Sequence, residues 1–304
     1  MTAIHPLISK KARIITHEMI RVARVTFDRV TARRTGVIFY GESRVGKSRC
    51  ARFVTDQLRE QFPECYVEFH SVRPREGPQR LNLFKEICHS ATILPKERVD
   101  YFYHLLGHIQ TVLAGVECGQ FVLVLDEIQY LEPADFHQLA SLYNSLQLKD
   151  ICLTLVGFAQ PDILKTLSGL KVTVKPQLIA RFFADLNAFH GCRNSDELAT
   201  ILRAYDSGSE FPPGSGTSYT AFFWPQAFAA GVRLVSLAEL FWQEISDAVS
   251  GVYVKNIPME HLCETVLNLL LAQAVKDSPS LQVCAADVSQ AVKTVNLRTF
   301  CDAK

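Results

Sequence analysis

The stretch that decides the fold is Gly41–Ser48, "GESRVGKS", which follows the apolar run "GVIFY" at 36–40. Two glycines, a lysine and a hydroxyl side chain fit the pattern G-x-x-x-x-G-K-[ST]. Glycine lets the backbone turn tightly and bring its N–H groups close to an anion. A helix that begins at Lys47 adds the positive end of its dipole. The stretch therefore predicts a phosphate-binding loop between a buried strand and a helix over 47–61.

Each residue of this loop has an expected role. Lys47 is expected to reach the β- and γ-phosphates of ATP and to act in catalysis, and the Ser48 hydroxyl to bind Mg²⁺. The alternative is an ordinary glycine turn before a helix, which requires an eight-position match by chance. The remaining residues expected to surround ATP are Gly41, Glu42, Ser43, Arg44, Val45, Gly46 and Arg49.

Two adjacent acids end a second apolar run, "FVLVLDEIQYL", at 121–131. Asp126 is expected to hold Mg²⁺, and Glu127 to orient and deprotonate the attacking water. Apolar strands often end in a polar pair, so the two acids alone are a moderate signal. They indicate a nucleotide site because a phosphate-binding loop precedes them by about 80 residues. Together the loop and the acids predict hydrolysis of ATP rather than storage of a nucleotide.

Two arginines are candidates for contact with the nucleotide. Arg181, in "QLIARFFADL" at 177–186, precedes the last expected strand, and its guanidinium would stabilise the charge that develops on the γ-phosphate. The alternative is a surface arginine at a helix end. Arg233, in "FAAGVRLVSLAEL" at 228–240, would contact the nucleotide of its own chain.

Strands are expected at 36–40, 66–72, 121–125, 151–156 and 182–189, with helical segments between them. This alternation predicts a parallel sheet that is covered on both faces. Helices are expected over 9–33, 47–61, 195–205, 228–250, 259–276 and 285–295. The expected organisation is a basic N-terminal helix in 1–34, an α/β nucleotide-binding domain over 35–192, and a helical lid over 193–304 with a mobile Gly/Ser/Pro-rich loop near 206–218.

The composition sets further bounds. The chain has 304 residues, 48% of them hydrophobic, and a net charge of +1, which does not by itself call for nucleic acid. Residues 1–34 hold eight basic residues against two acidic ones, which fits either a solvated helix face or a binding patch. Nine cysteines without a CxxC pair predict reduced thiols and a cytoplasmic protein. No apolar run reaches the ~18–20 residues that span a bilayer, so no membrane partner is expected.

These features together resemble the AAA+ class of ATPases, and more closely the TnsC/TniB family of transposition ATPases, including those of CRISPR-associated transposons. The resemblance covers roughly residues 30–295. It is carried by "GESRVGKSRCARF" (41–53), "GPQRLNLFKEI" (77–87), "VLVLDEIQYLEPADF" (122–136), "LTLVGFAQPDIL" (153–164) and "LIARFFADL" (178–186).

The resemblance implies an α/β P-loop AAA+ fold, with a five-stranded parallel sheet flanked by helices and a small C-terminal helical lid. It implies ATP and Mg²⁺ as cofactors, and a homo-oligomer, ring or helical filament, on double-stranded DNA. In such assemblies Arg181 would act from the neighbouring subunit, and the partners would be a transposase and a target-selector protein. In one respect the sequence departs from the family. Gly157-Phe158 stands where the family commonly has Gly-Thr, so Thr154 or Gln160 is expected to sense the γ-phosphate.

The family places basic residues that face DNA after the second strand. The corresponding segment here is 71–99, where a few phosphate contacts per subunit would add up around a ring. Such contacts go to the backbone and carry little base specificity. The alternative for each residue is a solvated loop charge. The expected DNA-binding residues are Arg73, Arg75, Arg80, Lys96 and Arg98.

Two other functions compete with transposition. An AAA+ initiator or loader of DNA replication shares these motifs, but an appended helix-turn-helix domain is expected of it, and only about ten residues follow the last expected helix. A nucleotide-switched signalling protein would hydrolyse ATP slowly, and Glu127 and Arg181 disfavour it.

Overall fold

The computed structural model describes residues 4–74, 82–95, 99–117, 119–173 and 182–303. The chain divides into two compact units. The sheet unit comprises Arg21–Glu42 and Lys47–Phe189, and the helical unit comprises the chain up to Ile20, Ser43–Gly46 and the chain from His190 on. The expected domains follow one another along the sequence, whereas these units interleave, and the segment 1–34 is divided between them.

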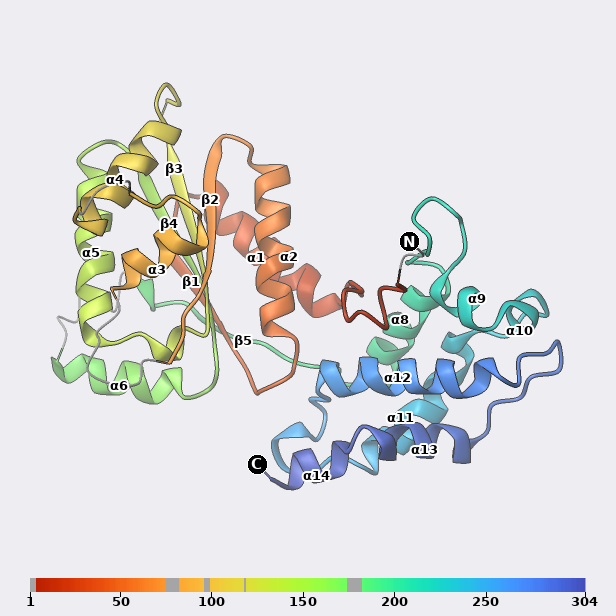
Figure 1. Cartoon of the computed structure of the whole chain (residues 1–304). Helices are drawn as coiled ribbons and strands as arrows, with labels where there is room; N and C mark the ends of the chain where they lie inside the picture. Colours follow the sequence, from red (N-terminus) through yellow and green to blue (C-terminus); the bar gives the residue numbers. More distant parts are fainter. Residues whose placement is uncertain (1–3, 75–81, 96–98, 118, 174–181, 304) are drawn as a thin grey trace. The chain divides into compact units, whose positions relative to one another are not determined.

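The sheet has five strands, all parallel, in the order β2-β3-β4-β1-β5 (Figure 1). All five predicted strands are present, and the fifth is shorter than predicted. Every residue of β3 is buried, as expected for a central strand of a parallel sheet that is covered on both faces. The bounds are β1 Gly36–Tyr40, β2 Cys65–Ser71, β3 Gln120–Asp126, β4 Cys152–Ala159 and β5 Leu186–Ala188.

The register brings the carboxyl ends of three strands to one edge of the sheet. Tyr40 of β1 pairs with Ala159 of β4, and Leu125 of β3 pairs with Gly157 of β4. Parallel α/β sheets bind their ligands at this edge. The residues that follow these three strands therefore lie where a nucleotide site is expected.

Helices cover the sheet on both sides. Helix α2 packs on β2, β3 and β4, while α5 packs on β4 and α3 on β2, and Figure 1 shows α3 and α5 on the side opposite to α2. The core on that opposite side is made of fully buried leucine, isoleucine and phenylalanine side chains. The bounds are α1 His17–Thr31, α2 Lys47–Gln61, α3 Leu83–Ser90, α4 Tyr101–Val112, η1 Ile128–Tyr130, α5 Pro133–Gln147 and α6 Ile163–Thr173.

The predicted basic helix over 9–33 is too long. Helix α1 begins only at His17, where the Thr16 hydroxyl accepts the Met19 N–H at 3.2 Å as an N-terminal cap. Before it, Lys10 adopts a left-handed conformation with φ 56°, which is incompatible with a continuous helix. The predicted bounds of α2 are confirmed.

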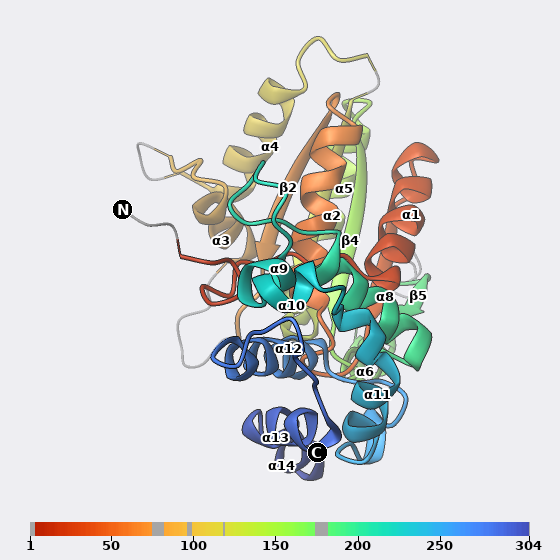
Figure 2. The same ribbon diagram turned by 90° about the vertical axis from the view of Figure 1, so that its right-hand side faces the viewer.

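The helical unit has a core of its own, with Trp224, Tyr205 and Tyr253 among its largest buried side chains. Figure 2 shows its helices α8 to α14. No helix in the described part of the chain is both long and apolar enough to cross a membrane. The bounds are α8 Ser195–Asp206, α9 Tyr219–Phe223, α10 Pro225–Ala229, η2 Leu234–Leu237, α11 Ala238–Ser246, η3 Gly251–Tyr253, α12 Met259–Ala274, α13 Ala285–Thr294 and α14 Leu297–Asp302.

The prediction of one helix over 228–250 is wrong. Gly231 adopts φ 98° and Arg233 is extended, so α10 ends and a short 3-10 turn precedes α11. The mobility expected of the loop near 206–218 stays a prediction. The Glu210 carboxylate accepts the N–H groups of Gly214 at 2.5 Å and Gly216 at 3.0 Å.

The residues before α1 form an N-terminal arm, residues 4–16, that packs in the helical unit. Leu7 and Ala12 belong to the core of that unit, and Lys10 pairs with Glu264 at 2.7 Å. The buried His5 ring lies 4.7–4.8 Å from four aromatic rings, and burial lowers the pKa of His5. The four rings are those of Phe211, Tyr219, Phe222 and Phe223.

Asp206 ties three elements of the helical unit together. Its buried carboxylate accepts the Thr220 hydroxyl at 2.7 Å through Oδ1. Oδ1 also accepts the Leu234 N–H at 3.0 Å, and Oδ2 accepts the Val235 N–H at 2.9 Å. The end of α8 is thereby joined to α9 and η2.

Replacing Asp206 with alanine is expected to destabilise the helical unit by about 3 kcal/mol, because a buried donor without a partner costs ~1–3 kcal/mol. Both tryptophans, Trp224 and Trp242, lie in this unit, so intrinsic fluorescence during urea unfolding reports on it. Exposed Asp247→Ala is the control and should stay within about 0.5 kcal/mol of the parent chain. Equal midpoints for the two variants would contradict the role of Asp206.

Candidate nucleotide and magnesium site

Both glycines of the motif are required by the backbone of the loop. A Cβ on Gly41 would lie 2.2 Å from the Phe189 carbonyl oxygen, so only glycine fits there. Gly46 adopts φ 109°, which side chains disfavour. The Gly41 N–H donates to Ala159 O at 3.1 Å and fixes the start of the loop against the end of β4. The predicted strand, loop and helix are all present.

Lys47 is buried at the first turn of α2. Its Nζ donates to Gly41 O at 2.8 Å and to Glu42 O at 2.6 Å. These bonds hold the positive charge against the loop that is expected to cradle the phosphates.

The tip of the loop, Ser43–Gly46, groups with the helical unit. Arg44 is left-handed with φ 61°, and its carbonyl accepts the Glu260 N–H at 3.2 Å from the first turn of α12. Its guanidinium lies 4.8 Å from the centre of the Phe300 ring in α14. The Tyr253 hydroxyl donates to Ser43 O at 3.4 Å. Residues of η3, α12 and α14 therefore contact the loop tip.

Asp126 and Ser48 form a set of oxygen donors. Asp126 is 3% exposed, and burial raises the pKa of its carboxyl group, while a hydrogen bond with the Ser48 hydroxyl and the charge of Lys47 act in the opposite direction. Mg²⁺ prefers carboxylate oxygens together with phosphate and water. A buried carboxylate beside a hydroxyl at the start of α2 therefore fits the predicted magnesium site.

Glu127 follows Asp126 in a left-handed conformation with φ 57°, and its N–H donates to Asp126 Oδ1 at 3.0 Å. Two side-chain amides donate to its Oε2. One is that of Gln129, and the other is that of Gln160 at 3.4 Å. Gln129 was not foreseen from the sequence, although it is the next polar side chain after the two acids.

Thr154 and Gln160, the two residues expected to sense the γ-phosphate, lie at different ends of β4. The Thr154 hydroxyl donates to Arg34 O at 2.9 Å, in the amino-terminal half of β4. Thr154 is therefore wrong as a sensor, because the loop lies at the carboxyl end. Phe158 is fully buried and packs on Phe39 with 5.4 Å between ring centres. Gln160 follows β4 at the carboxyl edge and contacts Glu127.

Three arginines complete the predicted nucleotide contacts. Arg233 donates from Nη1 to Phe228 O at 2.7 Å and to Val232 O at 2.8 Å, and its guanidinium lies over the Phe228 ring. These local bonds hold the turn after α10. Arg49 is exposed on α2, and Arg181 lies outside the described residues. Contact of these arginines with ATP stays a prediction.

The predicted DNA segment is described only in part. Arg73 is exposed directly after β2. The Val72 N–H donates to Asp126 O at 2.9 Å, so this segment leaves the sheet beside the candidate magnesium ligand. Arg75, Arg80, Lys96 and Arg98 lie outside the described residues.

The basic charge of α1 is partly used within the sheet unit. Arg21 donates to Ala188 O at 2.7 Å, and Arg29 pairs with Asp185. Both contacts hold α1 against the β5 segment. Arg24 and Arg34 are exposed, so only part of this charge is presented to solvent.

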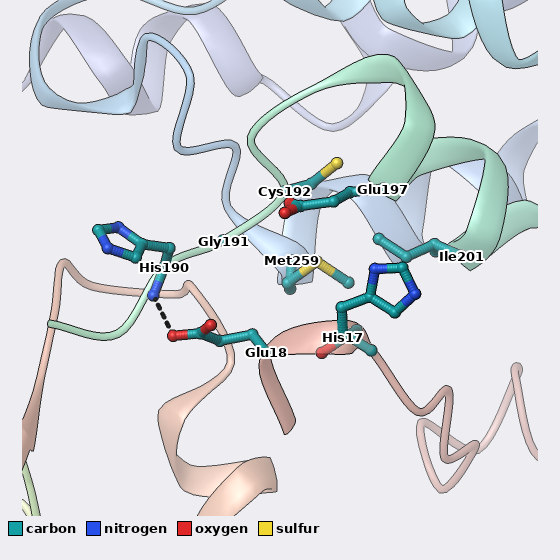
Figure 3. Close-up of a pocket in the computed structure, with 9 residues that line it drawn as sticks. His17, Glu18, His190, Gly191, Cys192, Glu197, Ile201 and Met259 are labelled. Carbon is teal, nitrogen blue, oxygen red and sulfur yellow. Dashed lines mark hydrogen bonds between the residues drawn. The ribbon is translucent and has the colours of Figure 1, made fainter. Parts of the chain in front are cut away.

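The helical unit holds a small, partly open pocket (Figure 3). Glu18 Oε1 accepts the His190 N–H at 3.0 Å at its edge. The Met259 side chain lies 3.6 Å from the position of a Cβ on Gly46, so the pocket adjoins the loop. No motif indicates it, because its residues come from distant stretches. They are Thr16, His17, Glu18, His190, Gly191, Cys192, Glu197, Ile201 and Met259.

Residues 31–167 match the family model of an AAA domain. Among solved structures, the chain is similar to ORC2 of Aeropyrum pernix, with 16% identity and a TM-score of 0.60 over 91% of this chain and 67% of that one. Cdc6p of Pyrobaculum aerophilum is 14% identical, with a TM-score of 0.60 over 96% of this chain and 71% of that one. Domain III of the Thermotoga maritima replication initiation protein DnaA is 12% identical, with a TM-score of 0.53 over 97% of this chain and 99% of that one.

No curated protein matches the chain. At identities this low, the similar structures show the fold alone, and the narrower TnsC/TniB resemblance is not shown by these comparisons. The parallel sheet, its covering helices and the matched domain agree with one another. The chain therefore has the fold of P-loop AAA+ ATPases, and its residues 31–167 match the family model of an AAA domain.

Proposed function

We propose that this protein binds Mg²⁺ and ATP at the loop Gly41–Ser48 and hydrolyses the ATP with Glu127 as the general base. The observation that carries this proposal is the convergence of Lys47, Ser48, Asp126 and Glu127 at one edge of the sheet. The similar ORC2 structure contains ADPNP and ADP, which supports the choice of nucleotide.

In this proposal each residue of the site has a separate role in binding or hydrolysis. Lys47 and the loop N–H groups hold the phosphates, and Glu127 takes a proton from the attacking water. Asp126 and Ser48 hold Mg²⁺, which when bound would neutralise charge on the β- and γ-phosphates. Arg181 of a neighbouring subunit would stabilise the transferring phosphoryl group, so turnover would depend on assembly.

The second part of the proposal is that the ATPase assembles as a homo-oligomer on double-stranded DNA. It is supported by the resemblance in 77–87 and by the exposed Arg73 at the start of the basic segment. Repetition around an assembly would turn a few phosphate contacts per subunit into strong binding. This explains how a chain of net charge +1 would bind DNA.

Two DNA processes are candidates for this activity. One of the similar structures is a domain of a replication initiation protein, and it favours a role as initiator or loader over the transposition role expected from the sequence. Transposition is favoured by "GPQRLNLFKEI" and "LTLVGFAQPDIL". Crosslinking of a Glu127→Gln assembly in its own cells would separate them. Recovery of a replicative helicase would support the first candidate, and recovery of a transposase with a target selector the second.

Glu127→Gln should bind ATP with an affinity within about twofold of the parent chain, because Lys47, Ser48 and Asp126 remain. Turnover should fall by about 10²-fold or more, since the water loses its base. Phosphate release and fluorescent-nucleotide binding measure the two effects, with exposed Glu60→Gln as the matched control. Undiminished turnover would remove Glu127 from the mechanism. Slow turnover by the parent chain both with and without DNA would favour a signalling switch.

Arg181→Ala should bind ATP as the parent chain does and lose turnover in the assembly. Mixing Arg181→Ala with Glu127→Gln subunits should restore part of the activity, because some mixed interfaces hold both intact groups. Phosphate release across a series of mixing ratios measures this, together with light scattering to show that mixed assemblies form. Formation of mixed assemblies without any recovery would argue against action between subunits.

Replacing Arg80 and Lys96 with alanine should weaken binding to two unrelated duplexes alike. The slope of log affinity against log salt should become shallower by about 2 per bound subunit, because two phosphate contacts are lost. Fluorescence anisotropy with ATP and with ADP at several salt concentrations measures this. The matched control is Arg24→Ala with Arg34→Ala near α1. If only the control variant loses affinity, the DNA surface lies at α1.

A further inference from the structure

We propose that Gln129 is a positioning residue for ATP hydrolysis, which holds one oxygen of the Glu127 carboxylate so that the other oxygen faces the attacking water. This inference rests on the proposed role of Glu127 as the base. It adds a residue that neither the P-loop pattern nor the pair of acids indicates.

The turn after β3 gives Gln129 its place. Glu127 is left-handed, and the chain then forms the 3-10 turn η1. Ile128, fully buried, has its Cδ1 2.7 Å from the position that a Cβ on Gly157 would take. Glycine at 157 therefore leaves the space that Ile128 fills. This packing anchors the turn against β4 and directs the two polar neighbours of Ile128 toward the site edge.

Gln129 bridges Glu127 to the end of β4. Its Nε2 donates to Glu127 Oε2. Its Oε1 accepts the Gln160 N–H at 3.0 Å, so both ends of the amide are engaged. The Gln160 side-chain amide donates to the same Glu127 Oε2 at 3.4 Å. Three residues from two strand ends thus form one network around a single carboxylate oxygen.

The network selects which oxygen of Glu127 is used. A carboxylate offers about four acceptor positions on two oxygens. Both amide donors converge on Oε2, so Oε1 is the oxygen that would accept a proton from water. A base works only when its geometry relative to the water is fixed within hydrogen-bond reach. Because Phe158 is in the core, Gln129 and Gln160 supply the polar contacts at this end of β4.

The test uses the full chain with Mg²⁺, ATP and duplex DNA. Gln129→Met keeps the length of the side chain and removes both hydrogen bonds. Its kcat should fall by about tenfold, less than the ~10²–10⁴-fold that an acid–base group contributes, because Glu127 itself remains. Its affinity for a fluorescent ATP analogue and its thermal midpoint should match those of the parent chain. Exposed Gln147→Met is the matched control and should keep full kcat.

A double variant distinguishes positioning from a general structural effect. If Gln129 acts through Glu127, adding Gln129→Met to Glu127→Gln should slow single-turnover hydrolysis of labelled ATP by less than twofold. Independent, multiplying effects would overturn the inference. So would a full or raised kcat for Gln129→Met while Glu127→Gln is slow, and the proposed function would then stand. Wild-type turnover by Glu127→Gln would overturn both together.

Discussion

The hydrogen bond from the Gly41 N–H to Ala159 O continues the β1–β4 ladder one step beyond the strands, and the geometry of the site depends on it. It fixes where the loop starts, and the loop in turn holds the Lys47 ammonium through two carbonyls. The same β4 strand pairs with β3, so Asp126 and Glu127 reach the same edge. A backbone register thus sets the relative positions of the phosphate loop, the metal ligands and the base, because side-chain contacts alone could not place groups from three strands.

Residues of the helical unit hold the tip of the loop. A left-handed arginine costs of order 1 kcal/mol or more, and Arg44 is held in that conformation by the Glu260 N–H and the Phe300 ring. These contacts, from α12 and α14, fix the conformation of the loop tip Ser43–Gly46.

Local sequence patterns predicted the elements whose signals are local. The apolar run before Gly41 and the motif itself predicted β1 and α2 with their bounds, and Asp126 and Glu127 followed from the end of an apolar run. Features that depend on distant partners were missed. The charge and periodicity of the arm predicted a helix. The arm is not helical, and its Leu7 and Ala12 pack among residues far along the chain. No motif in the sequence marks Gln129. Its contact with the Gln160 N–H, which follows a different strand, is visible only in the structure.

The N-terminal arm has a consequence for how the chain is made. His5 packs among rings that begin at Phe211, roughly 200 residues later. At a synthesis rate of about 5–20 residues per second, the arm leaves the ribosome roughly 10–40 s before its partners. During that interval Leu7 and the apolar face of the arm lack the helical-unit residues that cover them, and the last strand of the sheet is completed only near its end. The core of the helical unit can therefore close around the arm only after the residues from Phe211 onward have been made.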